Sequence, residues 1–467
     1  MGFLLPAEPL ESLDAYLAVG GGAGLDAARK LGPEATVDEI RASGLRGRGG
    51  GGFPTGAKWS GVRGAKGTHR YVVCNAAEGE PGTFKDRTLM RRNPYQLIEG
   101  IAIATFALGA SEAFIGLKAS FTTEIEALER ALAEMTEAGL AGDAPIRLVR
   151  GPDEYLLGEE KALLEVIEGK DPLPRLLPPY LHGLFSTAPM MGWTPVSAIP
   201  GHQHAEESNP TLVNNAETLS NVPHILARGP SWFRTMGTAS SPGTIVATVV
   251  GDVAHPVVAE VELGTRLSEL LEGPAGGPLP GRRWKAAFSG AANPVIDASR
   301  FWLPLTYEDF KACGTGMGAA GFIVLDDTAC MVEAARVFSW FLHVESCGQC
   351  PPCKLGSEDI SVRLWRIQDG KGTDDDIEEI GGWLAKVTDG SRCYLATEEQ
   401  DVVSSVLRCF PEEFAEHLET GRCPRPREVP LGKIVDLSDG VVVYDERQAY
   451  KRPDWTYADQ PVVPEGV

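Results

Sequence analysis

The sequence predicts an α/β protein whose parallel sheet is followed by a small α+β unit and then by a helical unit. Strand-like and helix-like segments alternate over residues 70–150, a hairpin-and-helix pattern begins near residue 243, and helical patterns dominate the segment after residue 328. A chain of 467 residues is long enough for about two to four domains. We therefore expect domains at 1–240, 241–327 and 328–424, with a C-terminal tail at 425–467.

The first sheet is predicted from three short apolar runs with helix-like segments between them. In the second of those segments, Ile125, Leu128, Leu132 and Met135 recur at helical spacing and so mark one buried face. The order strand, helix, strand, helix, strand predicts parallel pairing with helices on the faces of the sheet. The runs are RYVVC at 70–74, AFIGL at 113–117 and IRLVR at 146–150, and the helix-like segments are PYQLIEGIAIATFAL and TTEIEALERALAEMTEAG.

The remainder of the chain changes in character twice. Residues 175–223 are rich in Pro, Gly and His, and we expect irregular backbone there, which in a compact domain usually serves function. Further on, GTIVATVVGDV and PVVAEVEL predict two paired strands, TRLSELLE predicts a short helix, and GFIVLDD predicts a later strand. The tail carries two weak strand signals and is expected either to wrap over the surface or to be partly mobile.

Charge and composition exclude some classes of partner. The formal net charge is −21, whereas general binding to nucleic acid or to anionic membranes needs a basic surface. The N-terminus lacks the basic and apolar regions of a signal peptide, and the longest apolar stretch, residues 100–111, is too short to span a bilayer. We expect a cytoplasmic protein with no nucleic-acid partner and no direct membrane insertion, and association with a membrane through a partner subunit stays open.

Three cysteines lie close together in ESCGQCPPCKLG. The C-x2-C-x2-C spacing lets one tight turn direct the thiolates of Cys347, Cys350 and Cys353 to one point, and Cys393 in GSRCYL is the natural distant fourth ligand. Four thiolates suit a [4Fe-4S] cluster. A zinc site with four cysteines is the alternative, although zinc sites usually combine two C-x2-C pairs. The other cysteines are expected to pack as small buried apolar groups: Cys74, Cys313, Cys330, Cys409 and Cys423.

The segment LRGRGGGGFPTGAKW, residues 45–59, combines six glycines with three cations. Glycine tolerates positive φ and lets a ligand approach the backbone closely, and anionic phosphates bind backbone amides and cations. The loop precedes the first clear strand, so it is not the usual dinucleotide fingerprint, which lies between a strand and a helix. By itself the run also fits a flexible surface turn.

Three polar segments favour a ligand site near this loop. CNAAEGEPGTFKDR follows a predicted strand, at the end of a parallel sheet where ligands bind, whereas YLLGEEKAL and LVNNAETLSN lie further along the chain. Each segment also has a simpler interpretation, as a turn, a solvated acidic helix start or a polar cap. Their candidate contacts are Asn75, Glu78 and Glu80, then Gly158, Glu159 and Glu160, and then Asn214, Asn215 and Thr218.

In combination, these segments resemble the NADH-binding flavoprotein subunit of respiratory complex I. The same family includes the diaphorase subunits of NAD-linked formate dehydrogenases and hydrogenases. The resemblance runs from about residue 40 to about residue 424, through SGLRGRGGGGFPTGAKW, NAAEGEPGTFKDR, GEEKALLEVIEGK, VNNAETLSNVP and SCGQCPPCKLG with a later cysteine. It implies a Rossmann-like domain that binds FMN and NAD(H), a ubiquitin-like β-grasp (soluble-ligand-binding, SLBB) domain, and a helical-bundle domain that holds a [4Fe-4S] cluster.

The resemblance also implies roles for individual residues. Arg48 and Lys58 would be cations near the phosphates, Phe53 would stack on the nucleotide, and Glu80 and Glu160 would lie near NADH. The whole implied cofactor site is Gly47, Arg48, Gly49, Phe53, Lys58, Asn75, Glu78, Glu80, Tyr155, Gly158, Glu159, Glu160, Val213, Asn214, Asn215 and Thr218, with Cys347, Cys350, Cys353 and Cys393 as the cluster ligands.

Activity and partners are likewise implied by the resemblance. NADH passes a hydride to FMN, which supplies electrons one at a time to the cluster, and no general acid or base is expected. The family's partners are a thioredoxin-like [2Fe-2S] subunit and a larger iron–sulfur subunit or a catalytic dehydrogenase or hydrogenase subunit. We therefore expect an FMN-dependent electron-transfer subunit that works between NAD(P)H and a [4Fe-4S] cluster.

Four features depart from the family pattern. Ala77 stands where the family has an aspartate, Gly61 where it has an aromatic residue, and Leu177 where it has a lysine. The connection at about 181–209 is longer than the family's and contains His202 and His204, which could share one metal but are more often solvated.

These departures would weaken nucleotide binding by about 1–3 kcal/mol for each contact that leaves a partner unsatisfied. Two alternatives therefore stay open. One is a subunit that keeps FMN and the cluster but takes electrons from another donor. The other is a non-catalytic scaffold that keeps only the cluster, or neither cofactor.

Overall fold

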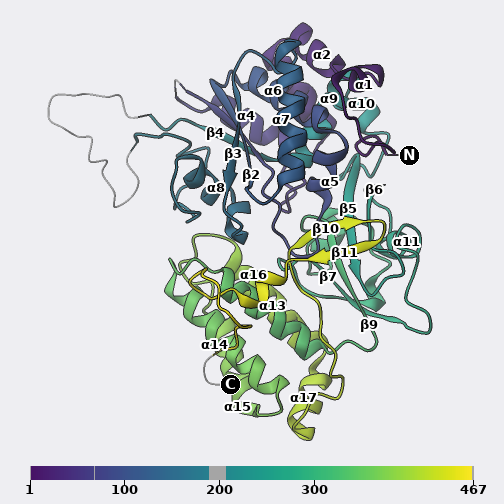
Figure 1. Cartoon of the computed structure of the whole chain (residues 1–467), viewed down its shortest axis with the longest axis vertical. Coiled ribbons are helices and arrows are strands. Elements are labelled where there is room, and N and C mark those ends of the chain that lie inside the picture. The colour runs from purple at the N-terminus through teal and green to yellow at the C-terminus, as the bar shows by residue number, and fades with distance from the viewer. Residues whose placement is uncertain (1, 68, 189–206, 465–467) are drawn as a thin grey trace, which may run out of the picture.

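The structure is a computed structural model that describes residues 2–67, 69–188 and 207–464 (Figure 1). Three regions follow one another along the chain: an α/β region, a region built around a second sheet, and a helical region. The C-terminal segment, yellow in Figure 1, runs back between them.

The first sheet has four parallel strands in the order β3-β2-β1-β4. The predicted runs form β1 (Tyr71–Asn75), β2 (Glu112–Lys118) and β3 (Ile146–Gly151), so the predicted parallel pairing is confirmed. The fourth strand, β4 (Thr211–Asn215), lies inside the segment expected to be irregular, and that expectation was wrong from residue 211 onward. Its side chains are mostly buried against the neighbouring strand and helices, so TLVNN forms a strand without a long alternating pattern.

Side chains of this sheet alternate between two apolar cores. Val72 and Cys74 face a larger core shared with several helices, whereas Val73 and Val213 face a smaller core shared with α8 (Glu160–Ile167). The sheet is therefore covered by helices on both faces, as a parallel sheet requires. The helices of the larger core include α2 (Ala23–Leu31), α3 (Pro33–Ser43), α4 (Thr55–Gly64), α6 (Pro94–Leu108) and α9 (Ala216–Arg228).

The predicted amphipathic helix α7 (Thr122–Glu137) packs beside α6. The remaining helices of this region are short. They are α1 (Leu13–Ala18), α5 (Lys85–Arg92), the 3-10 turn η1 (Tyr155–Gly158) and α10 (Pro230–Phe233).

The second sheet is mixed, with the order β6-β5-β9-β7-β8. The predicted hairpin, short helix and later strand are all present, and β5 pairs antiparallel with β6 but parallel with β9. The elements are β5 (Thr244–Gly251), β6 (Val257–Glu262), α11 (Leu267–Glu272), β7 (Trp284–Ser289), β8 (Ile296–Asp297), η2 (Ala298–Arg300), α12 (Tyr307–Ala312) and β9 (Gly321–Asp326).

The helical region packs α13 against α14 and α16 around one apolar core. Its helices are α13 (Met331–Glu345), α14 (Pro351–Gln368), α15 (Asp374–Leu384), α16 (Leu395–Cys409) and α17 (Pro411–Thr420).

The tail wraps over the other regions, which was one of the two expectations for it, the other being partial mobility. Its two weak strand signals form the hairpin β10 (Ile434–Ser438) and β11 (Val441–Tyr444), followed by η3 (Glu446–Tyr450). Arg87 of the α/β region donates to the carbonyl oxygen of Ile434 at 3.2 Å, and Lys433 pairs with Glu345 of α13 at 2.6 Å. The tail therefore ties the helical region to the α/β region.

Candidate functional site

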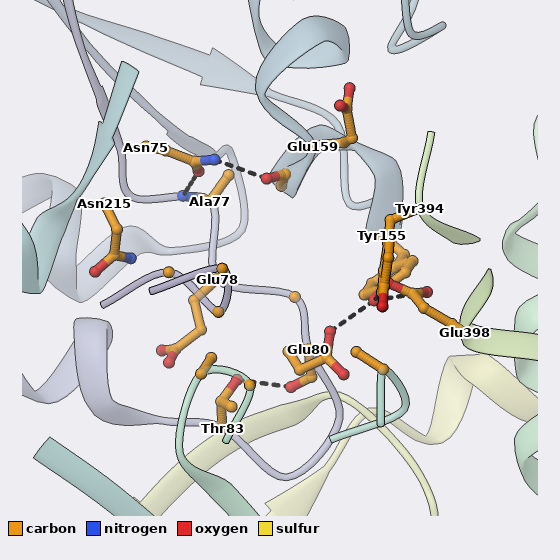
Figure 2. Close-up of a pocket in the computed structure, with 18 of the residues that line it drawn as sticks. Asn75, Ala77, Glu78, Glu80, Thr83, Tyr155, Glu159, Asn215, Tyr394 and Glu398 are labelled. Carbon is orange, nitrogen blue, oxygen red and sulfur yellow. Dashed lines mark hydrogen bonds between the residues drawn. The ribbon is translucent and has the colours of Figure 1, made fainter. Parts of the chain in front are cut away.

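A cavity of about 510 Å³ opens at the carboxyl ends of β1 and β4 (Figure 2). Strand β1 pairs with β2 on one side and with β4 on the other, and parallel sheets bind ligands at such a change of strand order. The volume is within the range common for small-molecule sites. The predicted cluster ligand Cys393 lines the cavity, as do eight of the predicted cofactor-binding residues: Gly49, Asn75, Glu78, Glu80, Tyr155, Gly158, Glu159 and Asn215.

The glycine loop forms one wall of this cavity. Gly49, Gly50 and Gly51 line it, and the loop is closed below them by the Gly47 amide, which donates to the Phe53 carbonyl oxygen at 2.8 Å. Gly50 has a φ of +117°, which side chains rarely adopt. The glycines therefore present bare backbone to whatever fills the cavity.

The two predicted phosphate cations have protein partners instead. Arg48 is fully buried; its side chain donates to the Pro242 carbonyl oxygen at 3.3 Å and lies 3.9 Å from Glu217. Lys58 pairs with Glu160 at 2.8 Å on α8. Neither Arg48 nor Lys58 is among the residues that line the cavity.

Several other predicted residues support the cavity from outside it. Val213 is buried in the apolar core, the Asn214 side-chain oxygen accepts from the Trp59 indole at 2.8 Å, and the Thr218 hydroxyl oxygen accepts from the Arg48 amide at 2.8 Å. Phe53 is 59% exposed on the surface of the loop. The contacts of Asn214 and Thr218 fix α4 and the glycine loop against β4 and α9.

Two asparagines position the loops that line the cavity. The Asn75 side chain donates to the Gly158 carbonyl oxygen at 2.7 Å and accepts from the Ala77 amide at 3.2 Å. The Asn215 side chain donates to Asp86 at 2.6 Å. Each asparagine stands at the end of its strand, so the pleat of the sheet directs both toward the same cavity.

Glu78 is held by the start of α5 rather than left free. Its carboxylate accepts from the backbone amides of Lys85, Asp86 and Arg87 at 3.0–3.3 Å. Burial and the nearby Asp86 raise the pKa of Glu78 to about 7, although the amides act in the opposite direction. A carboxyl group in this position can change its proton occupancy near neutral pH.

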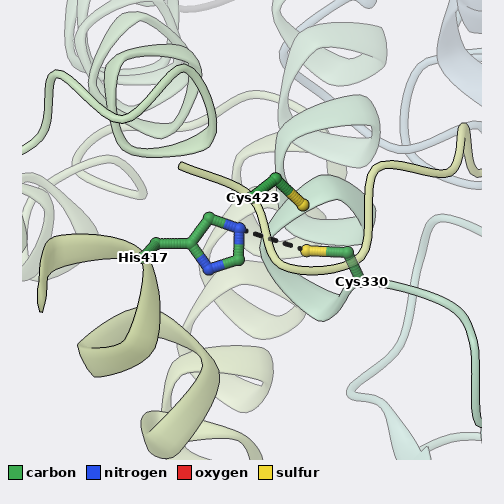
Figure 3. A group of neighbouring side chains, drawn as sticks. All are labelled: Cys330, His417 and Cys423. Carbon is green, nitrogen blue, oxygen red and sulfur yellow. Dashed lines mark hydrogen bonds between the residues drawn. The ribbon is translucent and has the colours of Figure 1, made fainter. Parts of the chain in front are cut away.

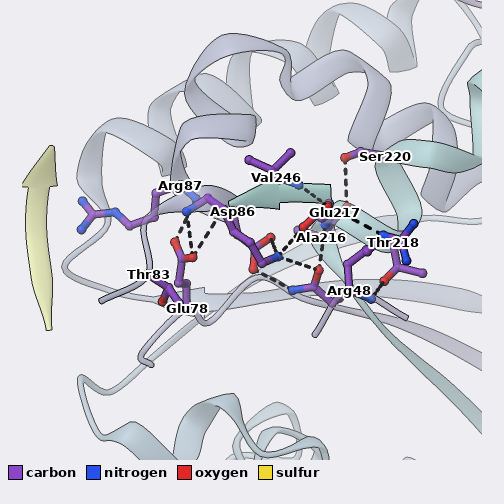
Figure 4. A network of polar contacts seen from close by, with 12 residues as sticks. Arg48, Glu78, Thr83, Asp86, Arg87, Ala216, Glu217, Thr218, Ser220 and Val246 are labelled. Atoms are coloured by element: carbon purple, nitrogen blue, oxygen red, sulfur yellow. Dashed lines mark hydrogen bonds and ion pairs between the residues drawn. The ribbon is translucent and has the colours of Figure 1, made fainter. Parts of the chain in front are cut away.

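A buried ion network borders the cavity, which its member Asp86 helps to line (Figure 4). Lys85 Nζ lies 2.8 Å from both Asp86 and Glu217, and Glu217 also accepts from the Val246 amide of the second sheet at 2.8 Å. Burial alone would lower the pKa of Lys85, but the carboxylates of Asp86 and Glu217 raise it overall. The sequence analysis did not predict this network. The charged residues in FKDR and NNAE, which lie next to the candidate contacts in the same segments, could have indicated it.

Glu80 and Glu398 converge on one tyrosine at the far end of the cavity (Figure 2). The Tyr155 hydroxyl group donates to Glu80 at 2.6 Å and lies 3.1 Å from both oxygens of Glu398, which is on α16. Burial raises the pKa of Glu80 to about 7, and burial together with Glu80 raises the pKa of Glu398 well above its ordinary value. Glu398 was not predicted, because it comes from the helical region.

Glu159 caps the first turn of α8. It accepts from the amides of Lys161 at 2.8 Å and Ala162 at 3.0 Å, and burial raises its pKa to about 7. The residue therefore combines a structural role at the helix start with a place on the cavity wall.

The four predicted cluster ligands come together around one small pocket. Cys347, Cys350, Cys353 and Cys393 all line it, with Leu156 of η1 between them and the larger cavity. Cys393 and Leu156 line both spaces, so the two sites are adjacent. Burial raises the pKa of Cys353 to about 11, so a metal is needed to hold it as the thiolate.

The departures from the family pattern fall in different places. Ala77 lines the cavity, whereas a Cβ added at Gly61 on α4 would meet open space. Leu177 lies in the connection after α8, away from the cavity lining. His202, His204 and most of the long connection lie outside the described residues.

Comparisons with known proteins agree with this architecture. Residues 40–224 match the Nuo51 FMN-binding domain, residues 333–417 the NADH-ubiquinone oxidoreductase-F iron-sulfur binding region, and residues 246–290 the SLBB domain.

Whole-chain relatives extend the match. The second NADH-quinone oxidoreductase F subunit of Rhizobium meliloti (strain 1021) is 40% identical over 418 residues, which cover 86% of this chain and 94% of that protein. NADP-reducing hydrogenase subunit HndC of Solidesulfovibrio fructosivorans is 34% identical, covering 91% of this chain and 83% of that protein. A solved structure, an NAD+-reducing [NiFe]-hydrogenase in the H2-reduced state, has a TM-score of 0.74 at 30% identity and covers 90% of this chain and 68% of that chain.

The motifs, the two adjacent sites and the whole-chain similarity agree, and the chain belongs to the family of NADH-quinone oxidoreductase F subunits.

Proposed function

We propose that this chain is the FMN-dependent electron-transfer subunit of a multi-subunit oxidoreductase and moves electrons between NAD(P)H and a [4Fe-4S] cluster. The observation that carries the proposal is the adjacency of the two sites: Cys393 and Leu156 line both the cavity at β1 and β4 and the pocket of the four cysteines. When bound, FMN supplies the step between two-electron chemistry at a nicotinamide and one-electron chemistry at an iron–sulfur cluster.

The cavity fits a flavin nucleotide. A Cβ at Gly49 would lie 3.0 Å from the Asn215 side chain, and one at Gly158 would lie 3.2 Å from the Ala77 carbonyl oxygen, so the cavity wall is tightly packed at both glycines. We assign the bare amides of Gly49, Gly50 and Gly51 to the phosphate end of the ligand. The Asn75 and Asn215 side chains lie at the ends of β1 and β4, where they can orient the polar groups of the ligand.

Residues for NAD(H) lie at the edges of the cavity. Glu80 is held at the far end of the cavity by Tyr155, and the exposed ring of Phe53 is free to stack on a nucleotide base. Glu160 and Lys58, paired on the surface of α8 and α4, provide a further polar contact. These side chains orient the dinucleotide, and we assign none of them as a general acid or base.

The four cysteines fit a [4Fe-4S] cluster by the chemistry of their donor set. All four are thiols that line one pocket, three come from one turn and the start of α14, and one precedes α16. Their role is to hold the cluster beside the cavity, with Leu156 excluding water between the two sites.

The domain arrangement and the partners extend the proposal. The hairpin, the helix and the order β6-β5-β9-β7-β8 support a β-grasp domain at 241–327, between a Rossmann-like domain at 1–240 and a cluster domain at 328–424. Relatives named as subunits of NADH-quinone oxidoreductase and of a hydrogenase support assembly with partner subunits. From the family resemblance we propose that these are a thioredoxin-like [2Fe-2S] subunit and a larger iron–sulfur or catalytic subunit. Among the described residues, no helix has the length and apolar character needed to cross a membrane. We place the chain in the cytoplasm, with any membrane contact made by its partners.

An anaerobic absorbance spectrum before and after NADH addition tests the proposal, with FMN and iron counted on the same sample. Bleaching of the flavin band supports it. Bound FMN and iron with no response to NADH would instead support a different electron donor, and protein that takes up no FMN would support a scaffold.

A further inference from the structure

Two cysteines and a histidine outside the electron-transfer site meet inside the helical region (Figure 3). Cys330 precedes α13, His417 lies on α17, and Cys423 follows α17. One possible ligand atom from each residue lies within 4.8 Å of the other two, and Cys330 and His417 are buried. The sequence analysis expected Cys330 and Cys423 to pack as small buried apolar groups. That expectation does not explain why both thiols lie beside His417.

The histidine is oriented as a metal ligand. Its Nδ1 lies 2.6 Å from the Glu413 carbonyl oxygen, one turn earlier on α17, so Nδ1 carries the proton and donates it there. Nε2 then has its lone pair directed at Cys330 Sγ, 3.4 Å away, where it can accept a hydrogen bond from the thiol or bind a metal. Burial lowers the pKa of His417, which keeps the ring neutral. A backbone carbonyl that fixes the other ring nitrogen is the usual outer contact of a metal-binding histidine.

The charges around the group suit a divalent cation. The nearby carboxylate of Glu413 does not compete for a cation, because Lys285 and Arg425 already pair with it. Two thiolates and one dication together are neutral, which removes the cost of burying isolated charges.

We propose that Cys330, His417 and Cys423 bind a zinc ion. Two sulfur donors and one imidazole nitrogen match the ligands that zinc prefers in a tetrahedral site. The Gln368 side-chain oxygen, 3.7 Å from Cys330 Sγ, or a water molecule completes the set of four. Binding releases the two thiol protons to solvent and transfers no electron.

The position of the site indicates a structural role. Cys330 caps α13, the helix that leads to the cluster ligands, and Cys423 stands just before the tail. Within the tail, Arg427 pairs with Asp252 at 2.5 Å, and Lys433 pairs with Glu345. Zinc would therefore fix the point where the tail leaves the helical region.

Metal analysis of the full-length protein, purified anaerobically with FMN and iron bound, tests this site. We expect one zinc ion per chain in addition to the cluster iron. Cys423→Ser and His417→Gln should each lose the zinc while keeping iron and FMN. Cys409→Ser, at another partly buried cysteine of the helical region, is the matched control and should keep the zinc.

Protein produced in zinc-poor medium with cobalt gives a second readout that does not depend on activity. Cobalt at this site should show intense ligand-field bands at wavelengths beyond the flavin and cluster absorption, and Cys423→Ser should lose them. Three results would overturn the proposal: wild-type protein that holds neither zinc nor cobalt, zinc that persists in both variants, or a Cys330–Cys423 disulfide found by peptide mapping of anaerobically purified protein.

Discussion

Tyr155 in η1 and Glu398 in α16 connect the α/β region to the helical region at the cavity wall, with the tyrosine hydroxyl group 3.1 Å from each carboxylate oxygen. The same hydroxyl group donates to Glu80 at 2.6 Å. A phenol has one proton to donate, so both contacts are hydrogen bonds only if one carboxyl group holds a proton. Burial and the nearby Glu80 raise the pKa of Glu398 well above its ordinary value, which makes Glu398 the protonated partner.

Glu398→Gln should therefore change how stability depends on pH. A carboxyl group with a raised pKa in the folded state binds more protons there than in the unfolded chain, so it destabilises the fold as pH rises. The amide does not titrate and can still donate to Tyr155. We expect the variant to gain stability over wild type as pH rises above the ordinary carboxyl pKa, by up to about 1.4 kcal/mol per pH unit. Unfolding temperatures of the FMN-loaded proteins across this range provide the measurement.

A surface carboxylate is the control for that series. Glu129→Gln changes an exposed residue that pairs with Arg150 on the surface, and its effect should stay under about 1 kcal/mol at each pH. A constant offset between wild type and Glu398→Gln from acid to alkaline pH would contradict the assignment of the proton to Glu398.

Gly49→Val should prevent FMN binding, because a branched side chain at the cavity wall meets Asn215. The added Cβ alone would lie 3.0 Å from the Asn215 Cβ, and the further methyl groups must enter the cavity or displace β4. Gly61→Ala is the matched control, since its Cβ meets open space. FMN content after gel filtration is the measurement, with far-ultraviolet circular dichroism to confirm folding. Equal FMN content in the two variants would show that the glycine loop does not hold the flavin.

Cys393→Ser should separate the two cofactor sites. The side chain lines the pocket of the four cysteines, so its loss should remove or convert the [4Fe-4S] cluster while FMN remains bound. Reduction of the flavin by NADH should then survive, and transfer to a one-electron acceptor through the cluster should fall. Cys313→Ser, a partly buried cysteine beside the second sheet, is the control. Iron counts and electron paramagnetic resonance of the reduced protein measure the outcome, and an unchanged cluster signal would remove Cys393 from the ligand set.

Glu345→Gln should release the tail from the helical region. Glu345 is fully buried between Lys433 at 2.6 Å and Lys451 at 2.9 Å. Its removal leaves two lysines without their carboxylate and should cost about 3–5 kcal/mol. Chemical unfolding and proteolysis of the tail measure the loss.

Glu345 should also make the stability of the fold depend on pH. Burial would raise the pKa of Glu345, but Lys433 and Lys451 lower it to about 2. The ion pairs therefore stabilise the fold above the ordinary carboxylate pKa, and this contribution is lost as pH falls toward 2. Asp38→Asn, in an exposed pair with Arg41, should have little effect at any pH. A tail that is cleaved equally in wild type and in Glu345→Gln would contradict the role of this clamp.

Local patterns were sufficient for most of the secondary structure. The runs at 70–74, 113–117 and 146–150 form adjacent parallel strands, because buried strands and amphipathic helices carry their own periodicities. Strand β4 escaped prediction because five residues after a proline-rich connection show too little alternation. The cysteine spacing likewise indicated one site, and Cys393 could be added to it because cluster ligands commonly combine a close group with a distant residue.

Side-chain partners could not be predicted in the same way. Arg48 and Lys58 fit a phosphate site by charge and proximity to glycines, yet burial against Glu217 and the approach of Glu160 give them partners within the protein. Glu398 and Cys330 became relevant only when the helical region folded against residues far away in sequence. Such contacts depend on distances that one-dimensional spacing does not contain.

By itself, the sequence determined the parallel sheet, the order of the three regions, the four-cysteine motif and the glycine loop, because periodicity, spacing and backbone freedom are local properties. Only the tertiary structure decided which charges line the cavity, that Leu156 and Cys393 are shared by two sites, that Tyr155 lies between two carboxyl groups, and that His417 meets Cys330 and Cys423. The physical reason is that burial and pairing set the charge of a side chain and its freedom to bind a ligand, and both arise from the packing of segments that are distant along the chain.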